Sequence, residues 1–321
     1  MAARSPSPNL RAVLFALAAF GVFATHDVII KILGGTYAPP QILFYSVLLS
    51  FPLVMLSLMR DAEPGTLIPV HPWWILLRTV TAVLTGVSAF YAFTVLPLAE
   101  VYAIIFASPL LITIMAIPVL GEVVRLRRWV AVLIGLGGVL IVLRPGQAEL
   151  ELGHLAALVA AVCSSVSSII VRRIGREERS VVLILYPMMG NFLTMACLLP
   201  FIYQPTELND LGLLGLLAVL AWLAQRLLIA AYQTGEAVIV APMQYSQILW
   251  AAFYGILFFD EGIDTATMIG SAIIIASGLY IALRESRADR SGQPVLQTQS
   301  RPEMGILPRI STLLRLKSRR P

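Results

Sequence analysis

Long apolar runs, separated by short polar stretches, make up most of this chain. Each run is close to the roughly 20 residues that an α-helix needs to cross the hydrocarbon core of a bilayer. Ten such runs lie near 11–33, 40–59, 74–94, 98–119, 126–143, 152–171, 180–200, 211–231, 237–259 and 266–283. They are apolar on all faces, unlike the strands of a transmembrane β-barrel, which alternate over about ten residues. The pattern predicts an all-α integral membrane protein with ten transmembrane helices.

Composition and charge support this class and indicate an orientation. Of the 321 residues, 58% are hydrophobic and only 13% are charged, against about 25% charged in soluble domains. The net charge of +5 lies at the ends of the runs and in the C-terminal tail, which is a pattern of membrane topology and argues against a nucleic-acid partner. With residues 1–10 in the cytoplasm, the outer loops receive only Arg144 among the arginines. The positive-inside rule therefore predicts an inner-membrane protein with both termini cytoplasmic, and 285–321 as a disordered basic tail.

Two stretches of the chain resemble each other. PLAEVYAIIFASPLLITIMAIPVLGE ends at Glu122, and EAVIVAPMQYSQILWAAFYGILFFDE ends at Glu261. A span rich in small residues follows each of them and leads to an arginine. We therefore predict two repeats of five helices, at 11–145 and 146–284. Because five is odd, the second repeat enters the membrane inverted, which is typical of secondary carriers with a substrate site between the halves.

These features resemble a known family. The ten spans, the two halves and the runs that end in Gly-Glu or Asp-Glu are similar to the drug/metabolite transporter superfamily, EamA type, over roughly 11–285. The resemblance implies a ten-helix carrier. Its cavity would be lined by spans one, three, four, six, eight and nine, with five and ten at the periphery. The segment THDVIIKILG also resembles the opening of a subgroup that takes up riboflavin or S-adenosylmethionine.

Three ionisable residues interrupt the first span: His26, Asp27 and Lys31. A charge near the centre of a span costs about 2.5 to 3.5 kcal/mol on insertion scales. Asp27 and Lys31 are four apart, so they share a helix face and are expected to neutralise each other. The cluster must face protein or water. An internal ion pair and a role in the transport path both remain open.

Two arginines also lie within apolar spans. Arg226 lies more than one helical turn from either end of the eighth span, and we expect it to face the cavity, with Asp27 as a candidate partner across the halves. Arg78 opens the third span and either extends to water or contacts substrate.

Aromatic and amide side chains gather in the ninth and fourth spans. Gln247 and Trp250 share a face in the ninth span by their spacing, and Tyr245 lies beside them. Tyr102 and Phe106 lie in the corresponding part of the fourth span. Such a face can bind a planar polar ligand or form hydrogen bonds between helices. Glu122 and Glu261 are expected to anchor the next helix, and the serines of the sixth span to allow close packing.

Other classes of function lack their motifs. The sequence contains no HExxH, no GxSxG and no aspartate pair in adjoining spans, so an intramembrane enzyme is a remote alternative. No CxxC or Walker A sequence is present, and we expect no metal, no cofactor and no ATP site in this chain. The leading prediction is secondary active transport of a small organic metabolite by alternating access, with riboflavin uptake first. S-adenosylmethionine uptake and amino-acid or drug efflux are alternatives. The expected partners are the substrate and the lipid bilayer, for a monomer or homodimer.

Overall fold

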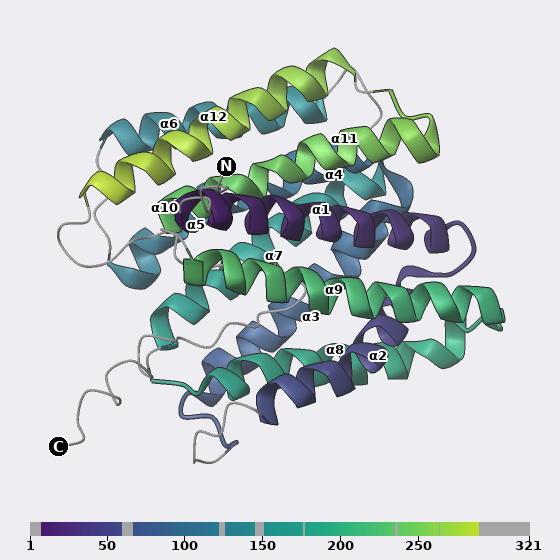
Figure 1. The fold of residues 1–321 in the computed structure, drawn as a ribbon. Helices are drawn as coiled ribbons and strands as arrows, with labels where there is room; N and C mark the ends of the chain where they lie inside the picture. The colour runs from purple at the N-terminus through teal and green to yellow at the C-terminus, as the bar shows by residue number, and fades with distance from the viewer. Residues whose placement is uncertain are drawn as a thin grey trace, which may run out of the picture.

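A computed structural model describes residues 8–59, 67–121, 126–144, 151–175, 177–234, 237–262 and 264–288. The regular structure of these residues is helical (Figure 1). The first half contains α1 (Pro8–Gly34), α2 (Pro39–Met59), α3 (Pro72–Val95), α4 (Leu98–Ile105), α5 (Ser108–Leu120) and α6 (Leu126–Leu143). The second contains α7 (Leu152–Ile174), α8 (Ser180–Ile202), α9 (Leu208–Thr234), α10 (Ala237–Val240), the 3₁₀-helix η1 (Ala241–Tyr245), α11 (Ser246–Phe259) and α12 (Thr265–Ala288). Most of the predicted tail lies outside the described residues.

Helix ends follow local chemistry. Pro72 stands in the first turn of α3, where its missing N–H costs nothing. Gly121 ends α5 with a left-handed φ of 71°, a conformation in which a Cβ would be strained. Glu151 precedes α7 in a capping box with His154, which satisfies free backbone N–H groups of the first turn.

The fourth and ninth predicted spans are each broken. α4 ends at Ile105 and α5 begins at Ser108, while η1 separates α10 from α11. A proline lies in the first turn of α5, and another in the first turn of η1. The alignment that sets Glu122 opposite Glu261 sets Phe106 opposite Tyr245, so the breaks fall at equivalent places. The predicted spans at 98–119 and 237–259 are therefore each made of shorter helical pieces, and the first still has the length and hydropathy of one membrane span over Leu98–Leu120.

The helices form a stacked bundle in which α6 and α12 make one edge and α2 and α8 the other (Figure 1). Between these edges, α1 packs against α9 and α3 packs against α7. This is one packing repeated with the halves exchanged, as a repeat architecture requires.

The contact between α6 and α12 depends on two facing glycines. A Cβ on Gly138 would lie 2.9 Å from the carbonyl oxygen of Gly270, and a Cβ on Gly270 would lie 2.6 Å from that of Gly138. Neither position has room for a side chain. Small residues let membrane helices approach closely in this way.

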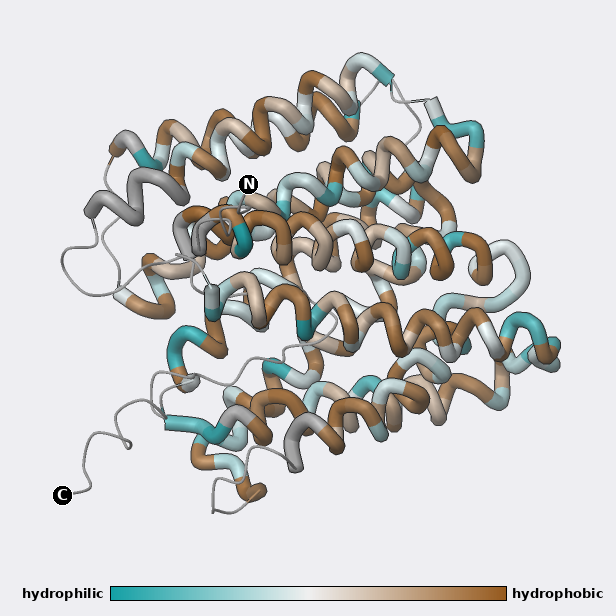
Figure 2. The backbone as a smooth tube through the Cα atoms, viewed as in Figure 1, coloured by the Kyte–Doolittle hydropathy of each residue, from teal (hydrophilic) through white to brown (hydrophobic). Residues whose placement is uncertain are grey.

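Apolar side chains cover the outside of the bundle. Figure 2 shows hydrophobic residues along the lengths of the helices and hydrophilic residues mainly near their ends. Large exposed side chains include Leu133, Leu249 and Phe253. Seven helices are long and apolar enough to cross a membrane, and two shorter apolar helices span Arg128–Leu143 and Thr265–Ile281 in the searched part of the chain. Such a surface suits lipid and not water.

Candidate functional site

The two breaks meet at the centre of the molecule. The ring of Phe106, just after α4, lies edge-on to the ring of Tyr245, at the end of η1, with centroids 5.3 Å apart. These residues are equivalent in the aligned halves. Equivalent residues can touch only near the axis that relates the halves, so this contact marks the middle of their interface.

A buried polar chain crosses the interface beside this point. Asp27 on α1 is 0% exposed and His26 is 2% exposed. The Nδ1 atom of His26 lies 2.7 Å from Oδ1 of Asp27, and the hydroxyl of Tyr102 donates to Oδ2 of Asp27. Nε2 of Gln247 on α11 donates to the Tyr102 oxygen at 3.2 Å. The chain thus runs from the second half through α4 to α1.

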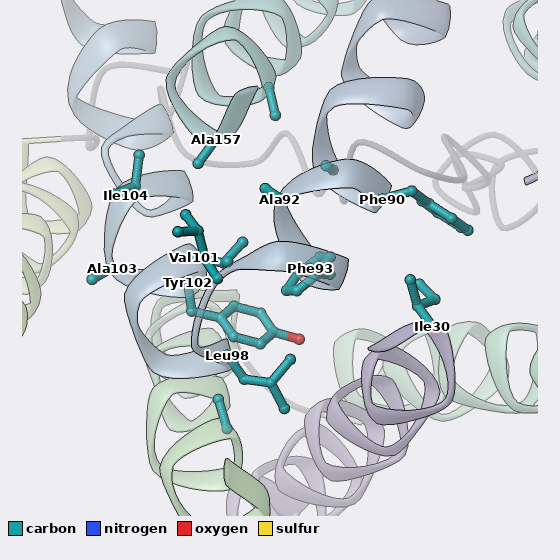
Figure 3. Close-up of a cluster of buried hydrophobic side chains, with 14 of the residues drawn as sticks. Ile30, Phe90, Ala92, Phe93, Leu98, Val101, Tyr102, Ala103, Ile104 and Ala157 are labelled. Atoms are coloured by element: carbon teal, nitrogen blue, oxygen red, sulfur yellow. The ribbon is translucent and has the colours of Figure 1, made fainter. Parts of the chain in front are cut away.

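Aromatic rings surround this chain. Tyr102 contacts Phe93 and Phe106, with centroid distances of 5.4 and 5.7 Å, and Phe90 lies edge-on to the His26 ring at 6.4 Å. Figure 3 shows Tyr102 extending from α4 past Phe93 and Leu98. A carboxylate among rings in a low-dielectric interior favours a positively charged ligand, because ring faces also attract cations.

Lys31 does not neutralise Asp27, contrary to expectation. Its ammonium pairs with Glu261 of the second half, donates to the carbonyl oxygen of Leu96 at 2.5 Å and lies 5.2 Å from the ring centre of Phe259. The two side chains differ in length. The short Asp27 side chain bonds to its neighbour His26 and to Tyr102, whereas the long Lys31 side chain reaches Glu261, which follows α11.

Glu261 also differs from its expected role of anchoring the next helix. It accepts the backbone N–H of Leu98 at 3.2 Å, so it joins α1 and α4 to the end of α11. The start of α12 is instead capped by Asp264, which accepts the backbone N–H of Thr267 at 2.9 Å.

Arg226 does not face the interior. Its side chain is exposed, and its guanidinium lies 5.7 Å from the ring centre of Trp222. The predicted orientation toward a cavity is therefore wrong, as is a pairing with fully buried Asp27. The register of α9 explains this, because Leu216, Val219 and Leu223 form an exposed stripe that Arg226 continues.

Arg78 is buried, with 4% of its surface exposed, so it does not extend to water. Its Nε donates to the carbonyl oxygen of Leu183 at 3.1 Å. Its Nη1 donates to the hydroxyl and the carbonyl oxygen of Ser167 at 2.9 and 3.2 Å. Arg78 thus joins α3 to α7 and α8 of the other half, and a substrate role stays a prediction.

The rest of the ninth-span face lies against α1. Trp250 is half-buried over Gly21, where a Cβ would lie 3.2 Å from the indole, and it stacks on Tyr254 at 6.2 Å. The hydroxyl of Tyr254 lies 2.9 Å from that of Thr25. Trp250 and Tyr254 therefore pack against the face of α1 that carries Gly21 and Thr25.

Sequence reasoning missed a second polar contact between the halves. Nε2 of His154 on α7 lies 2.9 Å from Oε1 of Glu100 on α4. The sequence signal that could have suggested this contact is that Glu100 and His154 each lie in the first turn of a helix. Within the part of the chain that the structure describes, no group of three or more His, Cys, Asp or Glu side chains could hold a metal ion.

Lipid-facing helices around a buried ionic chain define a multi-pass membrane protein. The EamA-like transporter family matches residues 10–144 and 151–283. The chain therefore belongs to that family, within the drug/metabolite transporter superfamily, whose members are carriers and not enzymes.

Several curated relatives share most of the chain. The pseudopaline exporter of Pseudomonas aeruginosa is 27% identical, covering 84% of this chain and 95% of the relative. The S-adenosylmethionine uptake transporter of Rickettsia bellii is 26% identical, covering 83% and 91%. The riboflavin transporter of Rhizobium johnstonii is 29% identical, covering 68% and 73%. One crystal structure, 19% identical, covers 87% of this chain and 98% of its own with a TM-score of 0.58, which shows a shared fold.

Proposed function

We propose that this carrier transports a small metabolite that combines an aromatic ring system with a positive charge, and that its substrate is S-adenosylmethionine. The supporting observation is Asp27, a fully buried carboxylate bonded to Tyr102 within a cluster of aromatic rings. S-adenosylmethionine carries a sulfonium and an ammonium group, both of which a carboxylate attracts, and an adenine ring that can stack on aromatic side chains.

Riboflavin, the first prediction from the sequence, is the second candidate. Gln247 supports it, because an amide can exchange hydrogen bonds with the polar edge of a flat neutral ring. A riboflavin site would not require the charge of Asp27. The two candidates therefore differ in which side chain matters most.

Alternating access by two inverted repeats, at 11–145 and 146–284, would carry this substrate. His154 lies near the start of α7, where it contacts Glu100. Arg173 lies near the end of α7, where it donates to the carbonyl oxygen of Val119 at 2.6 Å. Lys31–Glu261 adds to the first set of contacts and Arg78 to the second. Every one of these contacts joins the two halves, so we infer that one set breaks while the other holds.

We place the protein in the inner membrane with both termini in the cytoplasm. The positive-inside rule supports this placement, because the loops that would face inward carry almost all of the loop arginines. The contacts of Arg78 and Arg173 would then close the cytoplasmic side, and the Lys31–Glu261 pair the outer side.

The test is uptake by proteoliposomes that contain the purified full chain. Labelled S-adenosylmethionine and riboflavin are offered separately to the wild type, Asp27→Asn, Gln247→Ala and the control Ser165→Ala. We expect S-adenosylmethionine to accumulate in the wild type and the control but not in Asp27→Asn. Accumulation of riboflavin alone, lost in Gln247→Ala and kept in Asp27→Asn, would establish the second candidate and refute recognition of charge.

A further inference from the structure

The outer face of α9 carries a charge that no described side chain neutralises. Leu216, Val219 and Leu223 are 45%, 47% and 39% exposed, and Arg226 is the next residue on the same face. Arg226 contacts the ring of Trp222, and it forms no ion pair with any residue of the described ranges. A guanidinium on a lipid-facing stripe needs an anion, and among the described residues none supplies one.

The position of Arg226 along α9 brings a lipid headgroup within reach. The helix ends at Thr234, about 12 Å beyond Arg226 at 1.5 Å per residue. A long arginine stem can cover part of that depth and hold its charged group nearer the headgroups. Trp222 lies four residues before Arg226, so both side chains occupy one side of the helix.

A second basic residue lies toward the same end of the molecule. Ala12 and Ala16 of α1 belong to one packed cluster with Leu228 and Ala231 of α9. The beginning of α1 therefore lies beside the last turns of α9. Arg11 in that part of α1 is also exposed, which adds positive charge at the same leaflet.

We propose that Arg226, supported by Trp222, binds the phosphate of an anionic phospholipid on the outer face of α9. The guanidinium offers a planar pair of N–H donors that fits two phosphate oxygens. The indole of Trp222, 5.7 Å from the guanidinium, lies deeper in the membrane and supports the arginine side chain from below the headgroups. The charge of Arg11 favours an anionic headgroup over a zwitterionic one, which carries its own cation. This lipid site is separate from the buried chain at Asp27.

Native mass spectrometry of the full chain, purified in detergent, tests the proposal. The protein is titrated with phosphatidylglycerol and, separately, with phosphatidylcholine. We expect the wild type to retain phosphatidylglycerol in preference, and Arg226→Gln to retain at least fivefold less. Arg144→Gln, which removes one positive charge at the other end of the molecule, should retain as much as the wild type. Arg226→Lys, which keeps the charge but loses the fork, should fall between them, and it serves if Arg226→Gln does not fold.

Two results would overturn the proposal. Equal retention of phosphatidylglycerol by the wild type, Arg226→Gln and Arg226→Lys would show that the arginine holds no lipid. A wild-type dimer that Arg226→Gln converts to a monomer would assign the arginine to an acidic group of a second copy. Neither result bears on substrate uptake, so failure here is distinct from failure of the proposed function.

Discussion

The seam between α1 and α11 and the seam between α7 and α5 are equivalent in the two halves but differ in chemistry. Beside the first lies the buried Asp27, which is linked to Gln247 of α11 through Tyr102 of α4, and the seam ends in the Lys31–Glu261 pair. In the second, the hydroxyls of Ser108 and Ser164 lie 3.0 Å apart, and Ser165 donates to the carbonyl oxygen of Ser108 at 3.2 Å.

The difference shows that packing at this seam does not require charge. Small neutral residues close the second seam, as expected from the serines of the sixth predicted span. Burying ions costs free energy even when they are paired. The ions of the first seam therefore call for a reason beyond packing, and the proposed binding of a charged substrate would supply one.

The largest expected effect is on transport by Asp27→Asn. Loss of a charge-assisted contact worth about 1.5 to 3 kcal/mol should lower substrate uptake by about tenfold to more than a hundredfold. Initial rates in proteoliposomes measure this, with Ser165→Ala as the matched change in the other seam. An equal fall in both variants would remove the functional distinction between the seams.

The second effect is on stability, through Glu261→Gln. Lys31 and Glu261 are 11% and 18% exposed, so the unfolding free energy should fall by about 2 to 3 kcal/mol, below the usual loss for a fully buried pair. Denaturant unfolding in detergent measures it. Ser164→Ala should cost only about 0.6 kcal/mol. The exchanged pair Lys31→Glu with Glu261→Lys should recover part of the loss, and no recovery would argue that the charges do not act as a pair.

A smaller effect tests the centre of the second half, through Gly278→Ala. A Cβ at Gly278 would overlap the hydroxyl of Tyr245, so the substitution should cost about 1 to 3 kcal/mol of unfolding free energy. Adding Tyr245→Phe removes the hydroxyl but leaves the ring carbon Cζ 2.7 Å from the new Cβ, so it should relieve only part of that cost. The control is Gly137→Ala, where no atom lies within 4 Å of the new Cβ, and it should be neutral or slightly stabilising. Similar losses at both glycines would contradict the close approach.

The smallest effect lies away from both seams, where Arg144 after α6 pairs with Asp264 before α12. Burial by itself would raise the pKa of Asp264. Hydrogen bonds from Thr267 and the charge of Arg144 outweigh burial and hold that pKa below its usual value of 3.8. A folded pKa below the unfolded one gives stability that is present above about pH 4 and is lost as pH falls through the folded value. The loss should stay below about 1 kcal/mol, because the pair is partly exposed. Asp264→Asn should remove this part of the pH dependence, and an unchanged pH profile would contradict it.

Local information was enough for the spans but not for the interruptions within them. The third span was expected at 74–94 and runs over Pro72–Val95, because the length of an apolar run is written in consecutive residues. The break before Ser108 was missed, because Pro109 is also compatible with an ordinary helix start. The break lies at the centre of the molecule because Phe106 and Tyr245 approach each other there from the two halves. That contact is visible only in the tertiary structure.

The sequence also did not show which charged side chains pair with each other. Spacing along α1 correctly puts Asp27 and Lys31 on one side of the helix, yet Tyr102 and Glu261 come from distant elements and lie closer in space. Arg226 was misplaced for a related reason. A helix that is apolar all round has no pattern that distinguishes its lipid-facing side from its protein-facing side.

The sequence alone determined that this protein is a helical membrane protein with two related halves, because hydropathy and repetition are properties of consecutive residues. The tertiary structure decided which buried charges meet, where the spans break and which arginine is exposed on the outside of the bundle. Those outcomes depend on distances between elements that are far apart in the chain, and no local pattern contains such distances.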